Sequence, residues 1–187
     1  MNLADVFRHL THAFAHAGIP YMLTGSFASN LYGSGRATQD INLVIAAAPE
    51  QMPTLLSFFP KDDYYFDLSA AVEAARRHSM FNILDMVSGW KIDLIFQKPG
   101  AYHREAFNRR VQANVEGVPV IAATAEDLII AKLDWAKLGE SSRQLEDVAG
   151  VLKLRKDQLD SAYIEKWVVE LGLSSEWARA RQLAIQE

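Results

Sequence analysis

The chain has 187 residues, of which 50% are hydrophobic and 22% are charged, and its formal net charge at pH 7 is −4. This length suits one domain with a small helical extension, and the acidic balance argues against a general nucleic-acid coat protein. The sequence has no cysteine, which excludes disulfides and thiolate metal sites and fits a reducing compartment, so we expect a cytoplasmic protein. No apolar run approaches the ~18–20 residues of a membrane span, so we expect no membrane partner.

The first expected element is an amphipathic helix over residues 2–17. Its apolar side chains recur at helical spacing, and Gly18 follows where a helix would end. Three histidines, His9, His12 and His16, lie on roughly one side of this helix. Histidines at such spacing could bind zinc, but no carboxylate or further ligand accompanies them, so a polar surface is the better interpretation.

The stretch over residues 21–47 predicts a strand, a turn, a short helix, a loop and a second strand. The first strand ends at Gly25-Ser26, where Ser26 can cap the helix that follows. The second strand starts at Asp40, and because side chains alternate along a strand, Asp40 and Asn42 share the face opposite its apolar side chains. A polar pair beside a helix N-terminus that carries a glycine and a serine is typical of metal-phosphate sites.

The middle of the chain predicts two helices and a β-hairpin with a Ser-Gly turn. These elements are expected over residues 49–59, 68–78, 80–87 and 90–96. Asp93 lies on the second strand of the hairpin, and its side chain is expected on the face opposite to the apolar side chains of that strand. We expect this strand to lie beside the Asp40 strand in a mixed sheet.

A short basic segment and a second small hairpin precede a helical C-terminal part. The arginines of residues 102–110 are either a solvated face or phosphate contacts, and the solvated face is the simpler interpretation. From Thr124 onward the pattern predicts four helices, separated by Gly139, a basic segment over 153–156 and Gly172. We therefore expect two parts, an α/β core over residues 1–122 and a helical part over residues 123–187 that closes over the cleft.

These residues resemble the signature of the DNA polymerase beta type nucleotidyltransferases, in which a Gly-Ser turn is followed by Asp-x-Asp and a later strand adds a third carboxylate. Gly25, Ser26, Asp40 and Asp93 occupy these places, but the second aspartate of the motif is replaced by Asn42. The segments TGSFASNLYGSGRATQDINLVI and EDLIIAKLDWAKLGESSRQLEDVAGVL are most similar to small bacterial nucleotidyltransferases related to the AbiEii-like abortive-infection toxins.

The resemblance implies an α+β nucleotidyltransferase fold, with a mixed β-sheet flanked by helices and followed by a helical C-terminal part. It also implies a transferase that moves a nucleoside monophosphate from an NTP to an unknown hydroxyl acceptor on RNA, a protein or a small molecule. Two magnesium ions would be held by Asp40, Asn42 and Asp93, and Asp93 would also take the proton of the attacking hydroxyl.

The resemblance further assigns five residues to nucleotide binding, namely Gly25, Ser26, Arg36, Lys132 and Asp147. Lys132 would neutralise phosphate charge, and Asp147 would orient Lys132 or bind the nucleotide. Asp127, close to Lys132 in the sequence, is expected to be a surface charge.

Asn42 leaves two interpretations of the chain open. An amide oxygen can bind magnesium, but it is neutral and binds one ion rather than bridging two. The chain is therefore either a nucleotidyltransferase with impaired two-metal catalysis, or a non-catalytic protein on the same fold. The second alternative would bind nucleotide or a partner, for example an antitoxin within a toxin–antitoxin pair.

Overall fold

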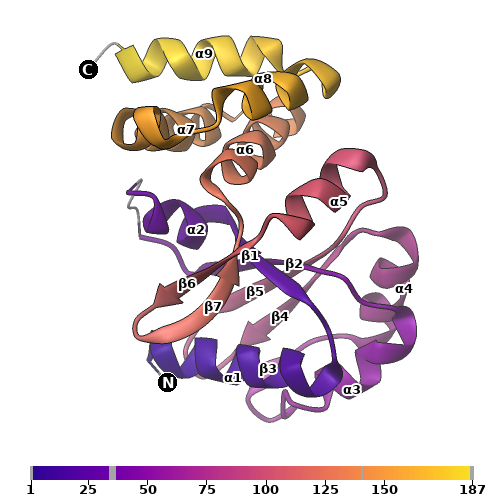
Figure 1. Ribbon diagram of the computed structural model, residues 1–187. Helices are drawn as coiled ribbons and strands as arrows, with labels where there is room; N and C mark the ends of the chain where they lie inside the picture. Colours follow the sequence, from indigo (N-terminus) through magenta and orange to yellow (C-terminus); the bar gives the residue numbers. More distant parts are fainter. Residues whose placement is uncertain (1, 34–36, 140, 186–187) are drawn as a thin grey trace. The chain divides into compact units, whose positions relative to one another are not determined.

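The computed structural model describes residues 2–33, 37–139 and 141–185 (Figure 1). The chain divides into two compact units, one of Met1–Thr24 with Ala37–Ala122 and the other of Gly25–Arg36 with Ala123–Glu187. The first unit thus differs from the expected core over residues 1–122 by the segment Gly25–Arg36. Within the described ranges, no helix has both the length and the apolar character needed to cross a membrane.

A mixed sheet forms the centre of the first unit, in the order β3-β4-β5-β2-β1-β7-β6. The strands are β1 (Tyr21–Thr24), β2 (Asp40–Ile45), β3 (Tyr64–Tyr65), β4 (Met80–Asp85), β5 (Lys91–Phe96), β6 (Val111–Val115) and β7 (Val118–Ala122). β2 runs parallel to β5, and β1 runs parallel to β7, whereas the other neighbouring pairs are antiparallel. The expected neighbourhood of the Asp40 and Asp93 strands is therefore confirmed.

Side-chain alternation on β2 and β5 builds the core of this unit. Ile41, Leu43 and Ile45 on β2 are at most 1% exposed. Their neighbours on β5, Ile92, Leu94 and Phe96, are at most 1% exposed as well. Burying side chains of this size stabilises the folded state by about 1.5–3 kcal/mol each. Exposing this face of the two strands would therefore cost a large part of the free energy of unfolding.

The helices of the first unit are α1 (Leu3–Ala17), η1 (Pro49–Gln51), α3 (Met52–Leu56), α4 (Leu68–Arg77) and α5 (Ala101–Asn108). α1 packs against α3 and β7, and it lies below the sheet in the view of Figure 1. Asn2 caps α1 by accepting a hydrogen bond from the Asp5 amide, and Gly18 ends the helix in the left-handed conformation. The expected helix over 49–59 is instead a 3₁₀ turn that starts at Pro49 and a short helix that has Pro53 in its first turn.

A buried carboxylate organises the turn between β4 and β5. Asp85 is 1% exposed, and its Oδ1 accepts hydrogen bonds from the amides of Val87 and Ser88 at 2.9 and 3.0 Å. Gly89 then adopts a φ of 76°, which a residue with a side chain rarely adopts. The expected Ser-Gly hairpin is thus confirmed, and Asp85 supplies the bonds that close it.

The second unit is helical. Its elements are α2 (Gly25–Leu31), α6 (Ala125–Gly139), α7 (Ser142–Arg155), η2 (Lys156–Gln158), α8 (Ser161–Glu170) and α9 (Ser174–Ile185). α6 packs against α2, α7, α8 and α9, so the four expected C-terminal helices form one bundle in which the other three contact α6. Gly33, with a φ of 96°, lets the chain after α2 approach α7 closely, since a Cβ there would come within 2.5 Å of Leu154.

A buried polar cluster links α6 to α8. Asp127 is 2% exposed, and it accepts hydrogen bonds from the Tyr163 hydroxyl at 2.7 Å and the Thr124 hydroxyl at 2.8 Å. The expectation that Asp127 is a surface charge is therefore wrong. Its partner Tyr163 lies on another helix, and no local pattern around Asp127 indicates that contact.

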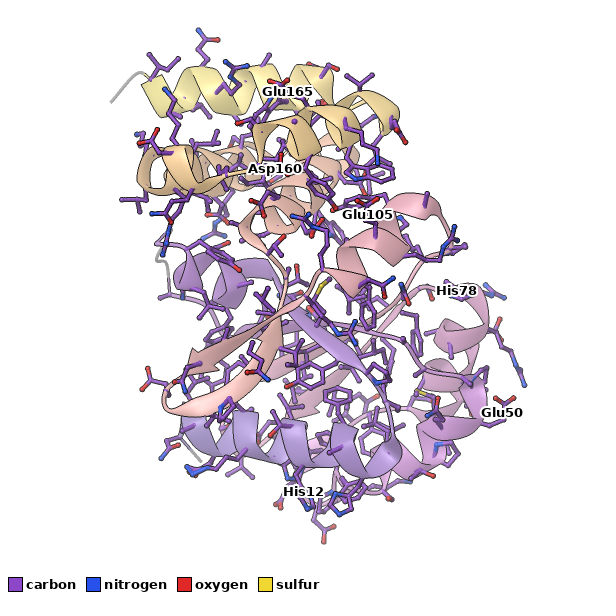
Figure 2. The ribbon with its side chains drawn as sticks, in the orientation of Figure 1. His12, Glu50, His78, Glu105, Asp160 and Glu165 are labelled. Atoms are coloured by element: carbon purple, nitrogen blue, oxygen red, sulfur yellow. The ribbon has the colours of Figure 1, made fainter. Side chains whose placement is uncertain are left out.

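The three histidines of α1 have different surroundings. The His9 ring packs edge-on against Phe59 and parallel to Tyr64, at centroid distances of 5.0 and 5.8 Å. His12 and His16 are exposed, and His12 points away from the sheet (Figure 2). Among the described residues, no group of three or more histidines and carboxylates could hold a metal ion, so these histidines do not form such a group.

Burial of the His9 ring makes the stability of the first unit depend on pH. Burial is the main cause that lowers the pKa of His9 from its usual 6.5, and the charge of His12 adds to it, while the Phe58 carbonyl and Asp85 oppose it. The unfolded chain therefore binds a proton at higher pH than the folded chain does. The stabilising contribution of neutral His9 is present above about pH 6.5 and is lost as the pH falls.

We predict that His9→Phe reduces the loss of stability on acidification, because it removes the group that must be protonated. The free energy of unfolding in urea, measured at about pH 7.5 and pH 5.5, checks this prediction. His16→Phe adds the same ring at an exposed position of the same helix, and its charge is not among the causes of the His9 shift, so it is the matched control. An equal pH dependence in the wild type and His9→Phe would contradict the role given to His9.

Candidate active site

Two neighbouring strands bring the polar residues of the first unit to one face of the sheet. In the parallel pair of β2 and β5, Asp40 lies opposite Lys91 and Asn42 lies opposite Asp93. Residues directly opposite each other on paired strands point to the same face, and so do residues two apart on one strand. Asp40, Asn42 and Asp93 therefore share a face, which is the arrangement that strand alternation predicts.

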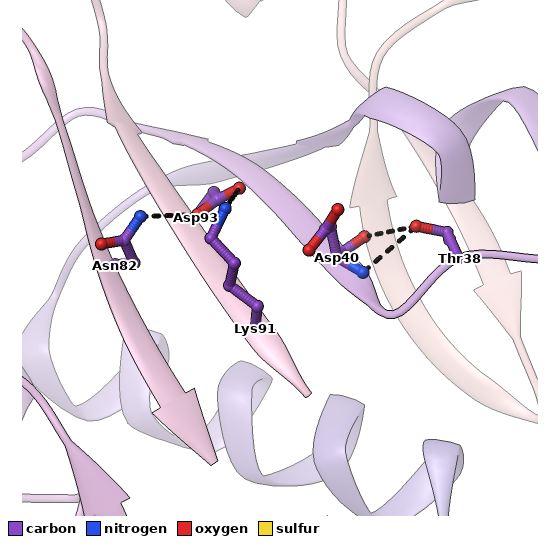
Figure 3. A network of polar contacts seen from close by, with 5 residues as sticks. All are labelled: Thr38, Asp40, Asn82, Lys91 and Asp93. Atoms are coloured by element: carbon purple, nitrogen blue, oxygen red, sulfur yellow. Dashed lines mark hydrogen bonds and ion pairs between the residues drawn. The ribbon is translucent and has the colours of Figure 1, made fainter. Parts of the chain in front are cut away.

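Asp93 is held by two side chains of the β4–β5 hairpin. Its Oδ1 accepts a hydrogen bond from Asn82 Nδ2 at 3.0 Å, and its Oδ2 accepts one from Lys91 Nζ, also at 3.0 Å (Figure 3). The Asp93 carboxylate is only 7% exposed, whereas the Lys91 side chain is 41% exposed. Asp93 is thus a buried carboxylate whose two oxygens are oriented by neighbours on its own hairpin.

Sequence reasoning missed Asn82 and Lys91. The position of Lys91, two residues before Asp93 on the same strand, was a usable signal, because such residues share a face. Asn82 gave no comparable signal, since its position opposite Asp93 depends on the register of the hairpin. Both residues belong to the immediate surroundings of the candidate site.

Asp40 stands at the exposed start of β2. The Asp40 amide donates to Thr38 Oγ1 at 3.1 Å, so the Thr38 side chain fixes the backbone where the strand begins (Figure 3). Asn42, two residues along the strand, is half-buried and lies opposite Thr24 of β1. Of the two carboxylates on this face, Asp40 is thus exposed at the first residue of its strand, whereas Asp93 is buried.

The donor set on this face fits a magnesium ion. Asp40 and Asp93 offer carboxylate oxygens and Asn42 offers an amide oxygen, and these are the hard ligands that magnesium accepts. Phosphate oxygens and water usually complete the coordination of magnesium in nucleotide sites, so few protein ligands are needed. Asp40, Asn42 and Asp93 are therefore the residues of this face that could hold a metal ion.

A pocket of about 330 Å³ adjoins this face at the edge of the sheet. It is lined by Tyr65, Phe66, Asp67, Ala70, Phe81, Asn82, Leu84 and Lys91. Asn82 and Lys91 also hold Asp93, so the lining of the pocket reaches the candidate site. Aromatic walls with a few polar groups suit a small organic molecule.

In the second unit, Lys132 and Asp147 form a buried ion pair between α6 and α7. Lys132 Nζ lies 2.7 Å from Asp147 Oδ2 and 3.2 Å from Gln144 Oε1. Lys132 and Asp147 are only 3% and 6% exposed. The structure pairs the two residues with each other, and their expected role in nucleotide binding stays a prediction.

The Gly-Ser turn has a different local structure from the one expected. α2 begins at Gly25, which has a φ of 67°, so Ser26 lies inside the helix and does not cap it. Ser26 is 6% exposed, and the Ser29 hydroxyl donates to the Gly25 carbonyl at 3.1 Å. Arg36, the remaining residue assigned to nucleotide binding, lies outside the described residues.

Comparison with known proteins identifies the fold but no sequence family. No protein-family model matches the chain, and no curated protein matches it in sequence. In structure, the chain is similar to ANT(2")-Ia in complex with adenylyl-2"-tobramycin, with a TM-score of 0.57, 13% identity, and coverage of 94% of this chain and 97% of that one. The chain has a nucleotidyltransferase fold.

Two further solved structures share the nucleotidyltransferase fold. An antigenic nucleotidyltransferase-like protein from Paracoccidioides brasiliensis has a TM-score of 0.54 at 17% identity, with coverage of 93% of this chain and 91% of that one. The lincosamide antibiotic adenylyltransferase LnuA, lincomycin-bound, has a TM-score of 0.52 at 10% identity, with coverage of 81% of this chain and 96% of that one. None of these three names points to an AbiEii-like protein, so that part of the resemblance stays a prediction.

The buried ion pair of Lys132 and Asp147 gives a prediction for stability. Lys132→Ala leaves the Asp147 carboxylate buried without this partner, so we expect it to lower the free energy of unfolding by about 3–5 kcal/mol. Replacing both residues, as Lys132→Met with Asp147→Leu, removes the buried charges together and is expected to recover most of that loss. Urea unfolding of the three variants and the wild type checks this, and unchanged stability of Lys132→Ala would refute a structural role for the pair.

Proposed function

We propose that this protein transfers a nucleoside monophosphate from an NTP to a hydroxyl acceptor, with magnesium as cofactor. The observation that carries the proposal is the shared face of Asp40 and Asp93 on adjacent parallel strands, within a nucleotidyltransferase fold. Two carboxylates placed in this way are suited to hold a metal–triphosphate complex beside an attacking group.

In this proposal the acceptor hydroxyl attacks the α-phosphorus, the bond to the β-phosphate oxygen breaks, and pyrophosphate leaves. Magnesium, when bound, supplies Lewis-acid stabilisation of the phosphate oxygens. Asp40 and Asn42 would contribute ligands, and Asp93 would contribute a ligand and accept the proton of the acceptor hydroxyl. Asn82 and Lys91 would keep the Asp93 carboxylate in position, because each donates to one of its oxygens.

The proposed nucleotide contacts of the second unit are those that the family resemblance implies, namely Gly25, Ser26, Arg36, Lys132 and Asp147. The burial of Lys132 and its bonds to Asp147 and Gln144 support a role in positioning the helices rather than an open phosphate contact. Nucleotide binding by the doubly substituted Lys132→Met and Asp147→Leu chain distinguishes these roles, since a positioning role predicts that binding is retained.

A small molecule is the acceptor that the structure supports best. The pocket beside Asn82 and Lys91 has a volume of about 330 Å³ and aromatic walls, which suit a compact organic molecule better than a nucleic-acid strand. The net charge of −4 points the same way. Two of the structural neighbours were solved with an adenylylated or free antibiotic, which is consistent with a small hydroxylated acceptor.

A second candidate function is nucleotide binding without transfer. In that case the protein would act through a partner such as an antitoxin. Asn42 is the observation that favours it, because an amide at this position removes a negative charge from a site meant for dications. A transfer assay with labelled nucleotide distinguishes the two candidate functions, since the second predicts triphosphate binding without a labelled product.

We predict that Asn42→Asp tightens magnesium-dependent triphosphate binding at least tenfold, equivalent to about 1.4 kcal/mol, and raises or creates transfer activity. The added carboxylate attracts the dication, whereas an amide only solvates it. Calorimetric titration with ATP, GTP, CTP and UTP, each with and without magnesium, measures the binding. Transfer of labelled nucleotide to components of a cell extract measures the activity.

Asn108→Asp is the matched control, because it makes the same change of charge at an exposed position on α5. It should leave both measurements at the wild-type level, and Asp93→Asn should abolish transfer. Failure of the wild type and of Asn42→Asp to bind any triphosphate would overturn the proposal. Binding without transfer by both proteins would instead support the second candidate function.

A further inference from the structure

The surroundings of Asp93 contain a cation that belongs to the protein. The Lys91 ammonium lies 3.0 Å from Asp93 Oδ2, within direct ion-pair distance. Lys91 also lies opposite Asp40 in the pairing of β5 with β2. Neighbouring strands are about 4.8 Å apart, so the lysine stem starts next to the first carboxylate and its ammonium contacts the second.

The position of Lys91 follows from the sheet and not from a mobile loop. Lys91 and Asp93 are two residues apart on β5, so their side chains leave the same face. β5 is paired on both sides, by β2 and by β4, and Lys91 lies in register with both neighbours. Backbone pairing therefore holds the Lys91 Cα close to the carboxylates, and the side-chain conformation then brings the ammonium to Asp93 Oδ2.

The charge on this face suits one dication and not two. Asp40 and Asp93 contribute two negative charges, Asn42 contributes none, and Lys91 cancels one. Two metal ions about 3.5–4 Å apart repel each other strongly, and bridging carboxylates normally offset that repulsion. Here the bridging position holds an amide, and the third carboxylate already has an ammonium as its partner.

We propose that Lys91 is the resident cation of this site and that the site binds a single divalent ion. The Lys91 ammonium neutralises Asp93 in place of a second metal ion, and the single ion is bound through Asp40 and Asn42 together with the triphosphate. This narrows the proposed function, because Asp93 then keeps its role as proton acceptor and not its role as metal ligand. This inference rests on the proposed function for its nucleotide, but the number of bound ions is a property of the site that can be measured without turnover.

The first test is a count of bound ions in the wild-type protein. Mn²⁺ is titrated into the full chain with a non-hydrolysable ATP analogue, and free Mn²⁺ is followed by electron paramagnetic resonance. We expect one Mn²⁺ per chain, with no signal from a coupled pair of ions. Two ions per chain, a coupled pair, or no bound ion would each overturn the inference.

The second test changes the lysine. Lys91→Met removes the resident cation, so we expect the affinity for Mn²⁺ alone to rise about tenfold, while Lys91→Arg keeps the charge and should stay near the wild type. Lys98→Met is the matched control, because Lys98 is an exposed lysine of the same unit, just beyond β5. Equal Mn²⁺ affinity of Lys91→Met and wild type would refute the role of Lys91.

Restoring the carboxylate completes the series. Lys91→Met combined with Asn42→Asp gives the face three carboxylates and no lysine ammonium beside them. We expect this chain to bind two Mn²⁺ ions, with the paramagnetic resonance spectrum of a coupled pair. Lys91→Met leaves the buried Asp93 carboxylate with its hydrogen bond from Asn82 but without the ammonium, so we expect some loss of stability, and the thermal transition of each variant verifies that it is folded during the titrations. Binding of one ion by the double variant would show that other features set the stoichiometry and would refute the inference.

Failure of this inference is distinguishable from failure of the proposed function. The Mn²⁺ titrations without nucleotide test the roles of Asp40, Asn42, Lys91 and Asp93 and do not require that a triphosphate binds. If Lys91→Met gains Mn²⁺ affinity and no variant binds a triphosphate, the role of Lys91 stands and the proposed function falls. If triphosphate is bound and transferred while the wild type holds two ions, the proposed function stands and the resident-cation role falls.

Discussion

The in-register parallel pairing of β2 with β5 is the constraint on which the first unit depends. Ile41, Leu43 and Ile45 are buried on one side of β2, and Asp40 and Asn42 take the other side because side chains alternate. A slip of one residue would exchange the two sets, so the free energy of core burial also fixes the position of the polar face. The same hydrophobic pattern therefore stabilises the fold and arranges its candidate chemistry.

Elements with strong periodicity could be predicted from the sequence. The limits of β1 and β2, the β4–β5 hairpin and the C-terminal helices follow from apolar spacing and from glycine and proline signals. The shared face of Asp40 and Asp93 could be predicted too, because alternation and strand order suffice for it. The ion pair of Lys91 with Asp93 was not predicted, because polar contacts depend on rotamers and on register, which an apolar pattern does not encode.

The helical unit shows the same limit in another form. α6 carries two buried charged residues, Asp127 and Lys132, and each finds its partner on a different helix. Unpaired charges in the interior would cost several kcal/mol each, so these bonds restrict which helices can pack against α6 and in which rotation. The local sequence identifies the helices, and the long-range polar pairs select one arrangement among those that apolar packing alone would allow.

The hairpin closed by Asp85 also has a consequence for the order in which the protein assembles. Asn82, Lys91 and Asp93 all lie on this hairpin, so their contacts need only a short loop to close. Asp40 and Asn42 come from a segment far away along the chain, and pairing β2 with β5 requires a much longer loop and a larger loss of chain entropy. A nascent chain can thus form the hairpin and the hydrogen bonds to the buried Asp93 carboxylate first. The slower, non-local pairing of β2 with β5 then adds the exposed Asp40.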